Sequence, residues 1–216
     1  MKLVATLFIL FTSLFSGVYG EGFKKNTALV DALKAKNIRL VVLCNFRGTN
    51  NIEDIITSSN SPAYEITSSG LQLLDDTAPI LAKYDISHIY VSMEFRVQQT
   101  ANLLGKALGL APDQLSLDPR LRMQHFGNAE GEDYDLYKAR FDSKKEMLES
   151  APKNGEAGIK VFKRTQDFLL TLKNLNEGET VLIVTHAFNF CHIAKCLTGK
   201  YNQVVSPGTF VVYDFQ

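Results

Sequence analysis

The sequence predicts an α/β fold of three layers, α/β/α, in which helices cover both faces of a mostly parallel central sheet. Short apolar runs with strand character alternate with longer segments of helical period, and this alternation is typical of α/β proteins. The first run, residues 40–44, is apolar throughout and rich in β-branched residues. Such a run is expected of a strand covered on both faces, which is how parallel sheets are built.

The remaining elements follow the same alternation. Three further runs are predicted as strands, and the last alternates like an edge strand: 86–92, 180–185 and 209–215. Four segments are predicted as helices: 67–84, 96–108, 134–149 and 156–175. Residues 113–132 have no clear period, and we expect an irregular lid near residues 117–131.

The first twenty residues have the three-part pattern of a secretory signal peptide. Lys2 gives a basic start, residues 3–15 are nearly all apolar, and small residues lead to Gly20. The apolar run is shorter than the roughly 20 residues of a membrane span. A single N-terminal membrane anchor is the alternative. We expect cleavage after Gly20, one domain over residues 21–216, no membrane span thereafter, and residence outside the cell or in the lumen of the secretory pathway.

Charge and cysteine content exclude several classes. Lys+Arg and Asp+Glu each total 23, so nothing resembles the basic surface of a nucleic-acid-binding protein. Cys44, Cys191 and Cys196 are too few for a disulfide scaffold, and buried free thiols are favoured. A Cys44–Cys191 bridge in an oxidising compartment stays open. No cluster has metal-ligand spacing and no glycine-rich loop occurs, so neither a metal nor a cofactor is predicted.

Polar residues follow three of the predicted strands, within segments 45–51, 92–96 and 186–189. In an open α/β sheet, ligands bind beyond the carboxyl ends of the strands. The pattern therefore predicts a site where these three segments meet.

Five blocks along the chain carry a family resemblance. They are residues 44–50, 66–72, 91–101, 118–131 and, together, 154–157 with 178–186. In order, they match Arg-His-Gly-x-Thr in part, Leu-Thr-x-x-Gly-x-x-Gln with one residue fewer, Ser-Ser-x-x-x-Arg-x-x-Gln-Thr-Ala, Asp-x-x-Leu-x-Glu-x-x-x-Gly, and Gly-Glu-Ser with a closing Ser/Thr-His. The set resembles the histidine phosphatase superfamily, and it implies a phosphoglycerate mutase-like fold from about residue 38 to the end.

The resemblance implies a demanding chemistry. In that family a histidine attacks a phosphoryl group, two arginines and a second histidine hold its oxygens, and a carboxylic acid protonates the leaving oxygen. Arg96 falls on one arginine and His186 on the second histidine. Asn45 falls on the first arginine, Phe46 on the nucleophile and Met123 on the acid. The Arg-His-Gly nucleophile motif is thus missing, and so is the acid. Phenylalanine cannot attack phosphorus, and methionine cannot donate a proton.

Two functions are consistent with this half-kept site. The first is a secreted pseudoenzyme whose partial cleft still binds a phosphorylated small molecule, another anion or a protein partner. Arg96 and His186 would be the main ligands in that cleft, with Asn45, Arg47 and Thr49 beside them.

The second is an active but divergent phosphomonoester phosphatase. It would use His125 or Glu130 in place of the missing acid or nucleophile, together with Arg96 and His186. His125 is a candidate because a histidine titrates near neutral pH.

Overall fold

The computed structural model describes residues 24–200 and 205–216. The predicted signal peptide lies outside these residues and stays a prediction. None of the helices in the two described ranges is both long and apolar enough to cross a membrane.

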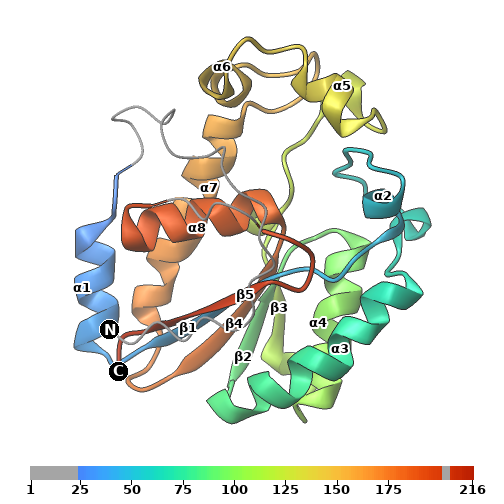
Figure 1. The fold of residues 1–216 in the computed structure, drawn as a ribbon. Coiled ribbons are helices and arrows are strands. Elements are labelled where there is room, and N and C mark those ends of the chain that lie inside the picture. The colour runs from blue at the N-terminus through green and yellow to red at the C-terminus, as the bar shows by residue number, and fades with distance from the viewer. Residues whose placement is uncertain (1–23, 201–204) are drawn as a thin grey trace.

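One five-stranded sheet runs through the centre of the molecule (Figure 1). Its strands are β1 (Arg39–Cys44), β2 (His88–Val91), β3 (Leu115–Leu117), β4 (Thr180–Thr185) and β5 (Phe210–Asp214). They lie in the order β3-β2-β4-β1-β5, and only β5, at one edge, runs antiparallel to its neighbour. The predicted three-layer, mostly parallel architecture is confirmed.

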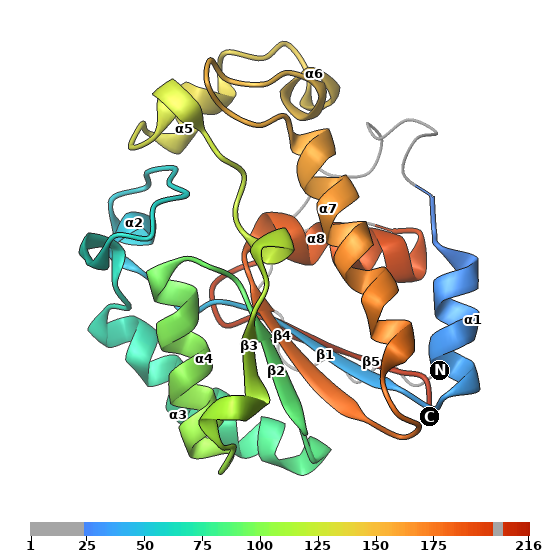
Figure 2. The same ribbon diagram turned by 180° about the vertical axis from the view of Figure 1, so that it is seen from behind.

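Helices cover both faces of this sheet (Figures 1 and 2). One face carries α3 (Ser68–Leu81) and α4 (Phe95–Ala107), and the other carries α1 (Thr27–Ala35), α7 (Gly158–Thr171) and α8 (Ala187–Thr198). Three short helices lie beyond the carboxyl ends of the strands: α2 (Thr49–Ile52), α5 (Tyr134–Lys138) and α6 (Lys144–Glu149).

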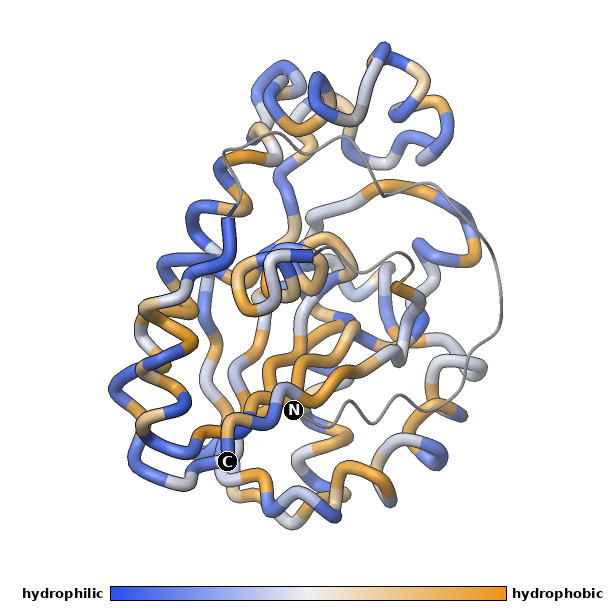
Figure 3. The backbone as a smooth tube through the Cα atoms, turned by 60° about the vertical axis from the view of Figure 1, so that its left-hand side comes forward, coloured by the Kyte–Doolittle hydropathy of each residue, from blue (hydrophilic) through white to orange (hydrophobic). Residues whose placement is uncertain are grey.

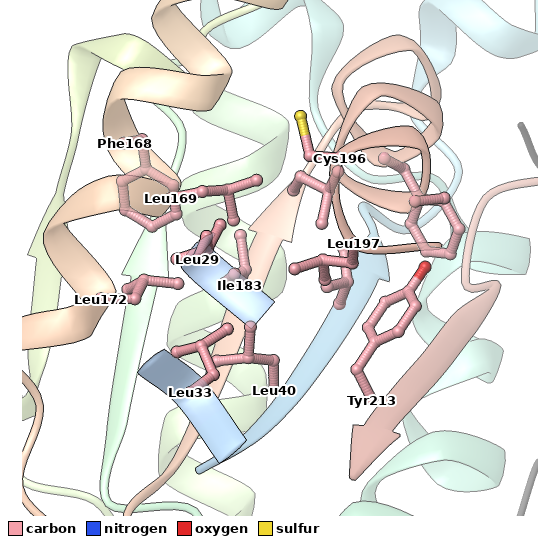
Figure 4. Close-up of a cluster of buried hydrophobic side chains, with 14 of the residues drawn as sticks. Leu29, Leu33, Leu40, Phe168, Leu169, Leu172, Ile183, Cys196, Leu197 and Tyr213 are labelled. Carbon is pink, nitrogen blue, oxygen red and sulfur yellow. The ribbon is translucent and has the colours of Figure 1, made fainter. Parts of the chain in front are cut away.

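Side-chain alternation along the central strands explains the two layers of core. Successive residues of a strand point to opposite faces, so Leu40 and Val42 pack toward α1, α7 and α8. Val41 and Leu43 pack toward α3 and α4. Figure 4 shows part of the first cluster, including Leu40 beneath the helices. In Figure 3 the hydrophobic colour gathers on the central strands.

The structure corrects the predicted elements in two places. The helix expected over 134–149 is two helices, because Ser143 accepts a hydrogen bond from the Glu146 amide and so starts α6 as a new helix. Three of the labelled elements, β3, α1 and α2, were not predicted. Strand β3 is only three residues long, and α1 is a short helix whose buried face is Leu29, Val30 and Leu33.

Two irregular segments, residues 54–58 and 123–134, cover the carboxyl ends of the strands, and we call them the roof. The backbone of Ile56 exchanges hydrogen bonds with Glu132 and Gly131 at 2.9 Å each. A small apolar cluster lies beneath them, made of Ile56, Phe126, Ala129 and Tyr137. The lid expected near residues 117–131 begins after Leu117, the last residue of β3. Residues 118–131 contain no strand or α-helix, and the structure adds their pairing with residues 54–58.

Candidate functional site

Three strand ends bring the predicted segments together. Cys44 pairs with Thr185 and Val91 with Val184, so β1, β2 and β4 end at nearly the same level. The next residues, Asn45, Ser92 and His186, therefore share one edge of the sheet. Each is at most 5% exposed.

Arg96 and His186 form the centre of the site. Arg96 lies in the first turn of α4, 3% exposed, and its Nη2 lies 3.4 Å from Nδ1 of His186. The same nitrogen donates to the Thr57 carbonyl of the roof at 3.1 Å. Nη1 of Arg96 is buried and, among the described residues, has no hydrogen-bond partner. A buried donor without an acceptor is costly, so this nitrogen is available to a ligand.

Glu94, which the sequence analysis did not single out, fills the other side of His186. Its Oε2 lies 2.7 Å from Nε2 of His186 and 2.5 Å from Oγ of Ser92. Its Oε1 accepts the Met123 amide at 2.8 Å. Glu94 is only 2% exposed. The carboxylate therefore takes hydrogen bonds from a ring, a hydroxyl and a backbone amide.

The protonation states follow from these contacts. Burial would raise the pKa of Glu94, but hydrogen bonds from His186, Ser92 and the Met123 amide outweigh it and hold the pKa below its usual range. Burial lowers the pKa of His186, although the Glu94 charge opposes this. We infer a neutral ring whose Nε2–H donates to Glu94 while Nδ1 accepts from Arg96, since this tautomer satisfies both contacts.

Burial also lowers the pKa of Arg96, and the charges of Glu94 and Glu130 work against that shift. A guanidinium stays protonated in proteins. One buried cation thus faces two carboxylates.

Ser92, His186 and Glu94 are the residue types of a hydrolytic triad, but their geometry does not make one. In a triad the histidine uses one nitrogen for the hydroxyl and the other for the carboxylate. Here Ser92 and Glu94 both meet Nε2, at 3.2 and 2.7 Å, while Nδ1 faces Arg96. In the inferred tautomer Nε2 carries a proton that it donates to Glu94, so the ring does not take a proton from Ser92.

Asn45 and Phe46 stand where the resemblance places the first arginine and the nucleophile. Nδ2 of Asn45 donates to the Phe46 carbonyl at 2.8 Å, and the Phe46 amide donates to Oγ1 of Thr100 at 3.1 Å. Phe46 is fully buried and belongs to the apolar cluster between the sheet and helices α3 and α4. Its side chain is therefore a core group.

Arg47 and Thr49, predicted as substrate-binding residues, make local contacts beside the site. Arg47 is exposed, and its carbonyl accepts from the Thr67 amide at 3.0 Å. Thr49 donates its hydroxyl to the Ala63 carbonyl at 2.7 Å and begins α2. Gly48, between them, runs against Arg96: a Cβ there would lie 3.1 Å from Arg96 Cδ. The glycine thus lets the backbone approach the guanidinium stem.

The three candidate residues of the roof lie away from the pair formed by Arg96 and His186. The Met123 side chain packs on the apolar cluster of the roof. Glu130 accepts from the amides of Ser58 at 2.9 Å and Phe126 at 3.0 Å, and from the Ser58 hydroxyl. His125 is exposed. Among the hydrogen bonds and ion pairs of the described residues, neither Glu130 nor His125 is joined to Arg96 or His186.

An ion pair holds the loop that carries Met123. Arg164 of α7 meets both carboxylate oxygens of Glu156, at 3.1 and 3.0 Å. It also donates to the Arg122 and Met123 carbonyls, at 2.5 and 2.9 Å. This pair therefore fixes the backbone whose amide binds Glu94.

All three cysteines are thiols, as favoured from the sequence; Cys44 and Cys196 are buried and Cys191 is partly buried. Burial raises the pKa of both Cys44 and Cys191 to about 12, so neither is a thiolate near neutral pH. Over the two described ranges, no group of three His, Cys, Asp or Glu side chains is placed to hold a metal ion.

A model of the histidine phosphatase superfamily (branch 1) matches residues 49–204. This is most of the chain, and the chain therefore belongs to that superfamily. The matched residues begin after Asn45 and Phe46. A search of curated protein sequences found no match.

Solved structures of this superfamily share the fold. A mycobacterial glucosyl-3-phosphoglycerate phosphatase, in complex with VO3, aligns with a TM-score of 0.67 and 21% identity, over 81% of this chain and 90% of the other. The α-ribazole phosphatase of Shigella flexneri aligns with a TM-score of 0.67 and 21% identity, over 82% and 90%. A phosphoglycerate mutase of Bacillus anthracis aligns with a TM-score of 0.67 and 20% identity, over 84% and 91%.

Proposed function

We propose that this chain is a secreted histidine phosphatase-like pseudoenzyme that keeps part of the family's anion site at Arg96 and His186. One observation carries the proposal: no second histidine accompanies His186. The sequence has four histidines, and all lie in the described part of the chain. Phe46, at the expected nucleophile position, is buried in the core.

The other three histidines are engaged elsewhere or exposed. His88 lies at the start of β2, the strand end opposite the site, and contacts Oγ of Ser116 at 2.9 Å. His192 packs edge-on against the rings of Phe162 and Phe188. His125 is exposed in the roof. The family's phosphohistidine route uses a second imidazole beside the one at the position of His186, and these positions do not supply one.

The ligand class follows from the groups that remain. Arg96 offers a buried guanidinium with one unpartnered nitrogen, and guanidinium groups bind phosphate and carboxylate oxygens well. The phosphatases with this fold act, by their names, on small phosphorylated molecules. We therefore propose a phosphorylated small molecule, or the anionic group of one, as the ligand.

The divergent-phosphatase alternative remains a hypothesis with less geometric support. Both carboxylate oxygens of Glu130 bind amides of the roof. His125 would have to turn inward from an exposed position. A phosphomonoesterase assay over a range of pH separates the two functions.

The purified protein should show no turnover of p-nitrophenyl phosphate above a blank. Turnover that disappears in both Arg96→Ala and His186→Ala would overturn the pseudoenzyme proposal. Binding of inorganic phosphate, measured by calorimetry, should be weak and should be lost in Arg96→Gln. N-terminal sequencing of the protein expressed in a secreting host tests the predicted start at Glu21.

A further inference from the structure

Glu94 is an acid inside the half of the site that has survived. It follows β2 and stands at the N-cap of α4, yet its side chain caps no amide of that helix. Instead it turns to His186, Ser92 and the Met123 amide. An imidazole N–H, a hydroxyl and a backbone amide are the donors that an oxyanion also takes in proteins. The Glu94 carboxylate therefore occupies the place of a ligand oxyanion.

The contacts of Glu94 also occupy the hydrogen-bond donors that would bind an anion from solution. With Nε2–H directed to Glu94 and Nδ1 facing Arg96, the His186 ring has no free donor. Of the three donors to Glu94, one comes from the roof, at Met123. A second anion can use His186 only after the carboxylate moves.

Charge leads to the same conclusion. Arg96 is 3% exposed, and a buried cation needs a compensating anion nearby. Of the carboxylates around Arg96, Glu94 raises the pKa of its guanidinium most and Glu130 less. A phosphate bound at Arg96 would lie beside the Glu94 carboxylate as long as that carboxylate stays in place. Like charges brought together in a buried site repel each other strongly.

Resting on the proposed anion site, we propose that Glu94 is its built-in anion, which competes with outside phosphate and sets the site's affinity. An outside oxyanion binds Arg96, through the unpartnered Nη1, and His186 when the Glu94 carboxylate is displaced from them. Glu94 thereby acts as the specificity-determining residue of the site. It disfavours a simple dianion, and it favours ligands whose remaining contacts offset the displacement.

Calorimetric titration with inorganic phosphate, at one pH and ionic strength, tests this on the whole protein. Glu94→Ala should lower the Kd of phosphate by roughly tenfold or more, because it removes both the charge and the occupying group. Glu130→Gln is the matched control. It removes a carboxylate that also acts on Arg96 but contacts Ser58 and Phe126 instead of His186, and it should change the Kd by less than about threefold.

Glu94→Gln, close in shape to the native residue, provides a second variant if the alanine variant does not fold, and it too should tighten phosphate binding. The double variant Glu94→Ala/Arg96→Gln should lose the gain. Equal affinities in the wild type and both Glu94 variants would overturn the role of Glu94 while leaving the anion site in place. If Glu130→Gln tightened phosphate binding as much as Glu94→Ala, a general effect of negative charge would explain the result, and displacement of Glu94 would be overturned. No phosphate binding in any folded variant would instead overturn the proposed anion site itself.

Discussion

Replacing Phe46 by histidine restores the residue type of the missing nucleophile, and we expect it to weaken the protein without creating an enzyme. Phe46 is fully buried in an apolar cluster. Losing the burial of its ring costs about 2 kcal/mol. An imidazole nitrogen left there without a partner costs about 1–3 kcal/mol more. The free energy of unfolding should therefore fall by about 3–5 kcal/mol in Phe46→His, a large share of the 5–15 kcal/mol typical of a domain.

Urea unfolding of Phe46→His, with Phe46→Leu as the matched control, measures this cost. The leucine variant stays apolar and should lose only about 1 kcal/mol. Neither Phe46→His nor the double variant Asn45→Arg/Phe46→His should hydrolyse p-nitrophenyl phosphate. A histidine variant as stable as the leucine variant, or measurable turnover in either histidine variant, would show that position 46 opens into the site, and would refute the reasoning.

Three further predictions test the roof, the loop support and the acid response. Glu130→Ala should speed amide hydrogen exchange at residues 55–58 and 126–134 and leave the central strands protected, because Glu130 joins these two segments. Glu156→Gln leaves the largely buried charge of Arg164 unpaired and should lower the free energy of unfolding by about 3 kcal/mol. Asp135→Asn, which removes an exposed acid, is the control and should lower the free energy of unfolding by less than about 0.5 kcal/mol. Burial lowers the pKa of His192 from 6.5 to about 3, so below pH 6.5 the unfolded state binds a proton that the folded state does not. The free energy of unfolding should therefore decrease as the pH is lowered from about 7.5 to about 5. The His192→Gln variant should lose about 2 kcal/mol less than the wild type over this range.

Each of these has a clear contrary result. Uniform acceleration of exchange in Glu130→Ala would mean that the roof does not open separately from the sheet. Equal costs for Glu156→Gln and Asp135→Asn would mean that the buried pair contributes no more than a surface pair. An unchanged pH dependence in His192→Gln would assign the acid response to other groups.

Much of the fold could be predicted from the sequence because burial determines where apolar residues recur along a strand or a helix. Residues 40–44 and 181–184 lie in the middle of the sheet, covered on both faces, and they are apolar throughout. Helix α7 carries a regular apolar stripe because one side of it packs on the sheet. The elements that were missed or misdrawn are short. Strand β3 has three residues, and one serine cap divides α5 from α6, so neither leaves a long periodic signal.

The candidate site was predicted in part for the same kind of reason. Parallel strands end at one edge, so the residues after β1, β2 and β4 meet there, and Arg96 and His186 were found together. Glu94 was missed because a single carboxylate before a helix is most simply interpreted as a cap. The one sequence signal was its place between Ser92 and Arg96, at a position that the family motif leaves open.

The sequence by itself determined the family, the layers of the fold and the absence of histidine at position 46, since these depend on residue type and spacing. Only the tertiary structure decided what Phe46, Glu130 and Glu94 do. Phe46 fills the core, Glu130 joins the roof, and Glu94 holds the donors that an anion would need. Each depends on side chains distant in sequence meeting in space, and on burial that makes an unpaired charge costly. The surviving half of the site therefore already contains an anion of its own.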